Sequence, residues 1–111
     1  MTSLQSKISK ISDALTGIEG LKVYHYWRSS LPVPCCVYYE QGDVGLQADN
    51  HKSEYAVEVY VDYYTRVEYD PAADAIMEVL STTENVGVSY EGAEFEEDTN
   101  LIHHSWACEV L

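Results

Sequence analysis

Residues 55–64 have the sequence YAVEVYVDYY, in which large apolar side chains recur at every second position. The residues of one parity are all apolar: Tyr55, Val57, Val59, Val61 and Tyr63. The other parity carries two acids, Glu58 and Asp62. Because successive side chains of a strand point to opposite faces, this alternation predicts a long β-strand with one buried face.

Two further strands are predicted before this segment. Residues 21–27 are rich in aromatic and β-branched side chains, which favour strands. Residues 35–40 form a short apolar run after Pro32 and Pro34, which exclude a central strand at their own positions. Glycines and turn-forming polar residues then predict a loop over about a dozen positions from Gln41.

Two more strands are predicted near the C-terminus. Residues 86–95 predict a strand, because apolar side chains stand at every second position from Val86 to Tyr90. Gly92 is suited to a bulge or bend in this strand. Residues 98–100 predict a turn. Residues 101–110 predict the last strand, because their apolar side chains share one parity with His104.

Two amphipathic helices complete the prediction. The first spans residues 3–16, and its apolar stripe has spacings of three and four: Leu4, Ile8, Ile11, Leu15 and Ile18. The second begins at Asp70-Pro71, because Asp accepts hydrogen bonds from free backbone N–H groups and Pro suits the first helical position. Its stripe consists of Ala73, Ile76, Met77 and Leu80.

The predicted order of elements is therefore α-β-β-β-α-β-β. Consecutive strands joined by short turns favour antiparallel pairing, and a sheet with one apolar face needs cover. We expect one α+β domain over residues 1–111, a two-layer sandwich in which two helices cover a mainly antiparallel sheet. The length of 111 residues suits a single domain.

The charge of the chain is strongly and unevenly acidic. Nineteen acidic and six basic residues give a net charge of -13 and a pI near 4.4, and residues 31–111 hold 17 of the acids with two of the bases. Affinity for nucleic acid comes from clustered Lys and Arg, so direct binding to phosphates is not expected.

The location predicted from the sequence is the cytoplasm of the cell that makes the protein. No apolar stretch approaches the roughly 20 residues of a membrane-spanning helix, so no membrane partner is expected. The start, Met1-Thr-Ser-Leu-Gln, lacks the pattern of a signal peptide. Three cysteines, two of them adjacent, suit a reducing compartment better than a disulfide scaffold.

Cysteines and histidines suggest metal or nucleophile chemistry only at first sight. Cys35 and Cys36, like His103 and His104, are neighbours in predicted strands, where they point to opposite faces. Structural zinc sites use separated ligand pairs at turns, so neither a metal nor another cofactor is expected. Cys108 lies roughly 13 Å along its strand from His104, too far for an activated thiol.

Acidic residues gather in two other places. Glu94, Glu96, Glu97 and Asp98 could bind calcium, but neither they nor the acids of the loop after residue 40 match an EF-hand loop. A solvated acidic surface is the favoured interpretation. The motifs of nucleotide-binding and hydrolytic enzymes are absent from the sequence, so no enzymatic activity is predicted.

The ten tyrosines suggest subunit contacts. Adjacent pairs such as Tyr63-Tyr64 cannot both face one core, so some of these rings lie near the surface. Tyrosine is enriched at protein interfaces, although pairing across the sheet explains the pattern equally well, and both interpretations stay open. The candidate interface comprises Tyr60, Tyr63, Tyr64, Asp43 and Asp49.

Several segments, taken in order, resemble one family. They are LPVPCCVYYE (31–40), Gly42-Asp43, Ala48-Asp-Asn, YAVEVYVDYY (55–64), Asp70-Pro71 before a helix, and FEEDTNLIH (95–103). This succession resembles the small tail-terminator, or tail-completion, proteins of siphophages and prophages of Gram-positive bacteria. The resemblance covers most of the chain from about residue 21, and the order of the segments is its most specific feature.

The resemblance implies an α+β subunit of a ring, hexameric in relatives, in the tail and neck of the virion. Such a ring stops growth of the tail tube and presents a surface to the head connector, without catalysis. Its implied partners are copies of itself, the major tail tube protein and a head-completion protein. DNA would pass through the ring without specific binding, and carboxylates lining the channel would repel phosphates.

A second interpretation comes from the charge alone. An acidic binding module, such as a DNA-mimic inhibitor, would use carboxylates spaced like phosphates to occupy the basic site of a nucleic-acid-binding protein. The partner that binds the chain distinguishes the two: a tail protein for the ring subunit, and a nuclease or repressor for the mimic.

Overall fold

The computed structural model describes residues 4–43 and 56–111. Two helices and five strands follow one another in the predicted order, α-β-β-β-α-β-β. Their bounds are α1 (Leu4–Thr16), β1 (Val23–His25), β2 (Cys35–Asp43), β3 (Val57–Thr65), α2 (Pro71–Thr82), β4 (Val86–Glu96) and β5 (Leu101–Val110).

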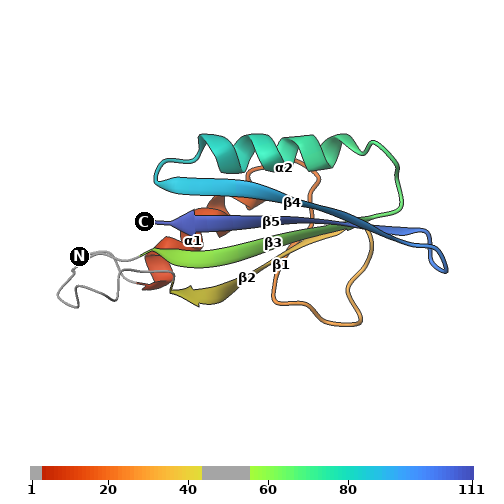
Figure 1. The fold of residues 1–111 in the computed structure, drawn as a ribbon, viewed down its shortest axis with the longest axis horizontal. Coiled ribbons are helices and arrows are strands. Elements are labelled where there is room, and N and C mark those ends of the chain that lie inside the picture. Colours follow the sequence, from red (N-terminus) through yellow and green to blue (C-terminus); the bar gives the residue numbers. More distant parts are fainter. Residues whose placement is uncertain (1–3, 44–55) are drawn as a thin grey trace.

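The strands form one sheet in the order β1-β2-β3-β5-β4, with α2 running along β4 (Figure 1). Both helices contribute to one apolar cluster with the inward parity of β3 and β5, so they cover the same face. The predicted two-layer α+β sandwich is confirmed. The opposite face of the sheet has no helix among the described residues.

The core forms on the parity that the sequence predicts. Val57, Val59 and Val61 of β3 are buried, and Tyr63 is 2% exposed. In register beside them on β5 lie Trp106, Cys108 and Val110, which are also buried. Tyr55, the first residue of the predicted alternation, lies outside the described residues.

The first strand differs from the prediction in length and direction. β1 holds three residues and pairs with β2 in parallel, whereas the other neighbours in the sheet are antiparallel. It ends at His25 because Tyr26 has a φ of 74°, which breaks the extended backbone. Residues 26–34 then return the chain to the start of β2, beside the beginning of β1.

The second helix begins as predicted. Asp70 is its N-cap and accepts a hydrogen bond of 2.9 Å from the Ala72 backbone N–H, and Pro71 is the first helical residue. Within its apolar stripe, Ile76 and Leu80 are buried in the core. The cap therefore fixes the start of α2, and with it one wall of the groove described below.

The last two strands form a long hairpin that extends past the helices (Figure 1). Its pairing shifts between Tyr90 and Gly92, and Gly92 has a φ of 111°, which confirms the predicted bulge. Residues 97–100 form the turn, also as predicted. No helix in the described part of the chain is long and apolar enough to cross a membrane.

Candidate functional site

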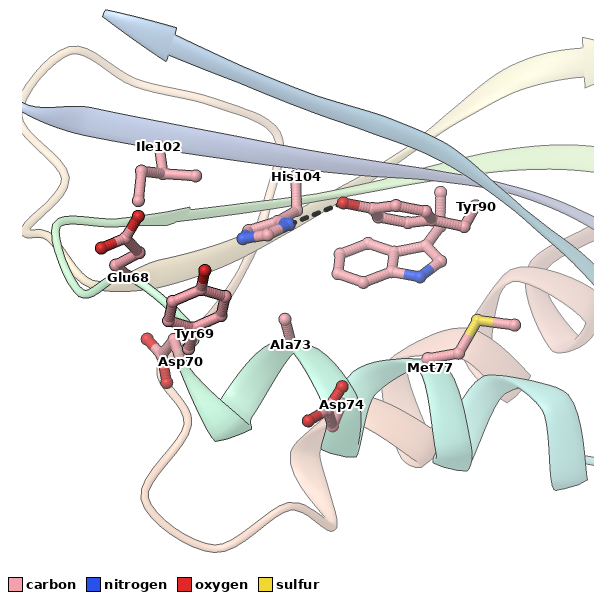
Figure 2. A pocket seen from close by; sticks show the side chains of 10 residues that line it. Glu68, Tyr69, Asp70, Ala73, Asp74, Met77, Tyr90, Ile102 and His104 are labelled. Atoms are coloured by element: carbon pink, nitrogen blue, oxygen red, sulfur yellow. Dashed lines mark hydrogen bonds between the residues drawn. The ribbon is translucent and has the colours of Figure 1, made fainter. Parts of the chain in front are cut away.

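A groove of about 540 Å³ lies between α2 and the hairpin. Its helix side consists of Ala73, Asp74 and Met77, and the turn before α2 adds Glu68, Tyr69 and Asp70. Its sheet side consists of Tyr90, Ile102, His104 and Trp106. Figure 2 shows Tyr69 and Asp74 on the helix side, facing His104 and Tyr90 across the gap.

Asp70 closes one end of this groove and is held by three hydrogen bonds. One carboxylate oxygen caps α2, and the other accepts from the hydroxyls of Tyr63 and Thr65, each at 2.7 Å. Burial alone would raise the pKa of Asp70, but these hydrogen bonds and the nearby His104 hold it below its ordinary value. Asp70 is therefore an ionised structural acid at neutral pH.

His104 faces the groove from β5. Its Nδ1 lies 2.9 Å from the Tyr90 hydroxyl, and Figure 2 shows its other ring nitrogen turned toward the space beside Ile102. Burial lowers the pKa of His104, against the attraction of Asp70, so the ring is neutral at pH 7. It therefore adds a polar group to the groove and no positive charge.

The groove thus combines acids with aromatic rings. Glu68 and Asp74 are exposed and have no side-chain partner among the described residues. Tyr69 is 93% exposed and has a φ of 59°, which places its ring outside the helix and at the groove. Among the residues that the structure describes, no Lys or Arg lines the groove. Carboxylates beside aromatic faces suit a cation with an apolar stem.

The helix-free face of the sheet carries a second aromatic cluster. The Tyr64 ring stacks on His103 with ring centres 4.3 Å apart, and the Trp27 ring centre lies 4.7 Å from that of Tyr64. Tyr39 and Tyr60 meet edge to face at 5.6 Å. The three tyrosines and His103 are half-buried and Trp27 is exposed, and the Tyr39–Tyr60 contact is the cross-strand pairing of tyrosines that the sequence left open.

An acid, a histidine and a serine also meet on the helix-free face. Asp62 is buried, and its carboxylate lies 3.3 Å from His103 Nε2. The Ser105 hydroxyl lies 3.3 Å from the same nitrogen. In a hydrolytic triad the acid and the nucleophile use different ring nitrogens, so this trio has no path for relaying a proton from Ser105.

The predicted interface residues occupy three different places. Tyr60 and Tyr64 lie on the helix-free face, where burial is the main cause that raises the pKa of Tyr64 to about 12. Tyr63 belongs to the core, where its hydroxyl bonds to Asp70, so it is no part of the surface. Asp43 ends β2 by pairing with Val57, and Asp49 lies outside the described residues.

The predicted acidic surface lies at the tip of the hairpin. Glu94 and Glu96 are exposed at the end of β4, and Glu97 and Asp98 are exposed in the turn that follows. Glu96 accepts a hydrogen bond of 2.7 Å from the Thr99 hydroxyl. Among the described residues, no group of three His, Cys, Asp or Glu side chains is arranged to hold a metal ion.

The three cysteines are free and buried. Burial raises the pKa of Cys35 and of Cys36, and it raises the pKa of Cys108 to about 12. They are packing residues with little thiolate at neutral pH, because a reactive thiol needs exposure and a lowered pKa.

The groove was not predicted from the sequence, because its walls come from three separate segments. One local signal was available: Tyr69 directly precedes the Asp70-Pro71 start of α2, where no apolar side chain is needed for the core. Comparison with protein-family models finds no match. Comparison with curated proteins finds no relative either.

Proposed function

We propose that this chain is a structural phage subunit that forms a ring on the tail tube and makes the tail side of the head–tail junction. The proposal combines the sequence resemblance with one structural observation, which carries it: the sheet has two unlike open edges. A ring needs such a pair, because each subunit must offer one patch to one neighbour and a different patch to the other.

The first open edge is β4. All 11 of its residues lie at the end of the sheet, and within the described residues it pairs only with β5. A long unpaired strand exposes a row of backbone N–H and C=O groups, which is a template for pairing with another chain. The length of β4 favours a partner along this edge.

The second open edge is formed by β1 and the rest of β2. β1 pairs with three residues of β2, Cys36 to Tyr38, so the part of β2 from Tyr39 to Asp43 has no strand beside it on this side in the described structure. Trp27, 47% exposed, lies in the connection after β1. This edge differs from β4 in length, direction and side chains.

The charge supports passage of DNA without adhesion. The net charge is -13, and the hairpin tip presents exposed acids at one end of the molecule. Carboxylates around a channel repel phosphates and offer no counterion-release gain. Within this proposal the partners are further copies of the chain, the tail tube protein and the head connector, and no catalytic step is involved.

Self-association tests the proposal. We expect light scattering on the purified chain to show a concentration-dependent rise in mass toward a closed ring, and negative-stain images to show annular particles. Tail tube protein should retain the chain, and double-stranded DNA should not. A mass that stays strictly monomeric up to about 1 mM, together with no retention by tube protein, would contradict the proposal.

A second candidate is favoured by one observation, the exposed acids Glu94, Glu96, Glu97 and Asp98 at the hairpin tip. Carboxylates on a projecting hairpin can imitate the phosphates of a nucleic acid and occupy a basic site on a partner. Inhibition of a nuclease or repressor by the monomeric chain, lost when these four residues are replaced by Gln or Asn, would favour this DNA-mimic function.

A further inference from the structure

We infer that the groove beside β4 is the docking site for the basic side chains that flank β1 of a second copy, with Arg28 as the principal anchor. This inference rests on the proposed ring, and it specifies which surfaces meet. Three independent features carry it: the chemistry of the groove, the positions of the unpaired cations, and the position of both on opposite edges of one sheet.

The groove is built for a cation. Glu68 and Asp74 line it and are unpaired among the described residues; Figure 2 shows Asp74 on α2 and Glu68 beside Ile102, with the exposed Tyr69 ring between the two. Met77 and Trp106 add apolar surface for an aliphatic stem. A guanidinium group can stack on an aromatic face while donating to carboxylates, which an ammonium group does less well.

The chain itself supplies matching cations. Lys10 donates to the Leu111 carbonyl at 3.2 Å, and Arg66 donates to the Thr99 carbonyl at 3.0 Å, so both are engaged within the subunit. Lys22 and Arg28 are exposed, and neither has a side-chain partner in the described parts of the chain. Their exposure is what a contact with a neighbouring molecule requires.

These two cations lie at the opposite edge from the groove. Lys22 directly precedes β1 and Arg28 lies three residues after it, while β1 ends the sheet on one side and β4 ends it on the other. The groove includes Tyr90 of β4. In a head-to-tail arrangement the β1 edge of one copy approaches the β4 edge of the next, which brings Arg28 toward Glu68 and Asp74.

Binding would join an exposed cation to exposed acids that have no partner among the described residues of their own subunits. Two acids in one groove raise the local negative potential, and the surrounding acidic chain attracts a cation from a distance. Docking in the groove removes the Arg28 guanidinium group from water, while the group gains carboxylate acceptors and an aromatic ring face. The contact between Arg28 and the groove therefore helps to fix which surfaces meet and how neighbouring subunits are aligned in the ring. Added salt should weaken the contact.

Charge reversal tests the inference in the full chain. The variants are Arg28→Glu, the pair Glu68→Lys with Asp74→Lys, and all three changes in one chain. The matched control is Glu97→Lys with Asp98→Lys, which makes the same charge change on exposed acids of the hairpin turn, outside both the groove and the residues that flank β1. Analytical ultracentrifugation measures association, and circular dichroism verifies that each variant folds.

We expect the wild type and the control pair to associate alike. Arg28→Glu and the groove pair should each weaken association by at least about tenfold, as loss of an interfacial charge partner does. The triple variant should recover most of it, and so should an equimolar mixture of the two reversed variants. Recovery is the decisive result, because damage to folding would not be repaired by a second reversal.

Two other outcomes overturn the inference in different ways. If the chain forms rings and the reversed variants associate as the wild type does, or if loss is not followed by recovery, the groove contact is wrong while the ring stands. If neither the wild type nor the control associates up to about 1 mM, and tail tube protein does not retain them, the proposed ring fails and this contact fails with it.

Discussion

Replacing Asp70 by Ala should cost the fold about 3 kcal/mol of unfolding free energy. The loss of an N-cap costs about 1 kcal/mol, and Asp70 is the cap of α2. Its second oxygen accepts from Tyr63 and Thr65, which are 2% and 0% exposed. Leaving each of these hydroxyls without its charged acceptor costs about 1 kcal/mol more. The melting temperature should fall by about 10–20 °C.

The control for this prediction lies one helical turn away. Asp74 has the same charge and no side-chain partner among the described residues, so Asp74→Ala should change stability by less than about 0.5 kcal/mol. Asn caps helices nearly as well as Asp but has one acceptor oxygen, so Asp70→Asn should lose an intermediate amount. Urea denaturation followed by circular dichroism measures all three variants.

The pH dependence gives the same prediction a second readout. The pKa of Asp70 is lower in the folded chain than in the unfolded chain, so the unfolded chain binds more protons as the solution is acidified. The stabilisation by Asp70 is therefore complete above about pH 4 and is lost as the pH falls through its folded pKa. A loss of unfolding free energy below about 1 kcal/mol in Asp70→Ala, or a loss no larger than that of Asp74→Ala, would refute the reasoning.

Three further predictions concern the core, the bulge and the groove. All three thiols should resist a thiol reagent at pH 8 and react once the chain is unfolded in denaturant, because Cys35, Cys36 and Cys108 are 0% exposed; fast labelling of the folded chain would disprove this. Gly92→Ala should cost about 1–2 kcal/mol through its φ of 111° alone, since an added Cβ meets no atom within 4 Å, whereas Gly87→Ala in the same strand should be nearly neutral in a thermal melt. The pKa of His104 is lowered by burial, so stability should decline as the pH falls below about 6.5, and urea midpoints of His104→Gln should lack this part of the decline.

Local sequence patterns predicted the parts of the fold that depend on local chemistry. The alternation in β3, the Asp70-Pro71 start of α2 and the bulge at Gly92 each follow from the backbone preferences of neighbouring residues. The parallel pairing of β1 with β2 could not be predicted in this way, because it depends on the positive φ of Tyr26 and on the path of residues 26–34. A period of two gives the face of a strand and not its partner.

In the candidate site, too, local sequence predicts the face on which a side chain lies, whereas tertiary packing determines its contacts. Parity places Tyr63 on the apolar face with the buried valines and Tyr64 on the face that carries Glu58 and Asp62, but it does not say what either ring contacts. Tyr63 points to the helices and bonds Asp70, whereas Tyr64 stacks on His103. The groove unites residues of the β3–α2 turn, α2 and the hairpin, so only tertiary packing brings Glu68 and His104 to one place.

The uneven charge of the chain also favours one mode of assembly over another. Pairing two copies through the same β4 edge would set the acids of each strand, Glu91, Glu94 and Glu96, against their own counterparts. Pairing through two β1 edges would oppose Arg28 to Arg28. Like charges at an interface cost free energy, whereas joining the β1 edge to the β4 edge sets cations against acids. Unlike surfaces joined in this way close a ring or extend a filament, so the charge pattern favours the head-to-tail contact that the proposed ring requires over a contact between like edges.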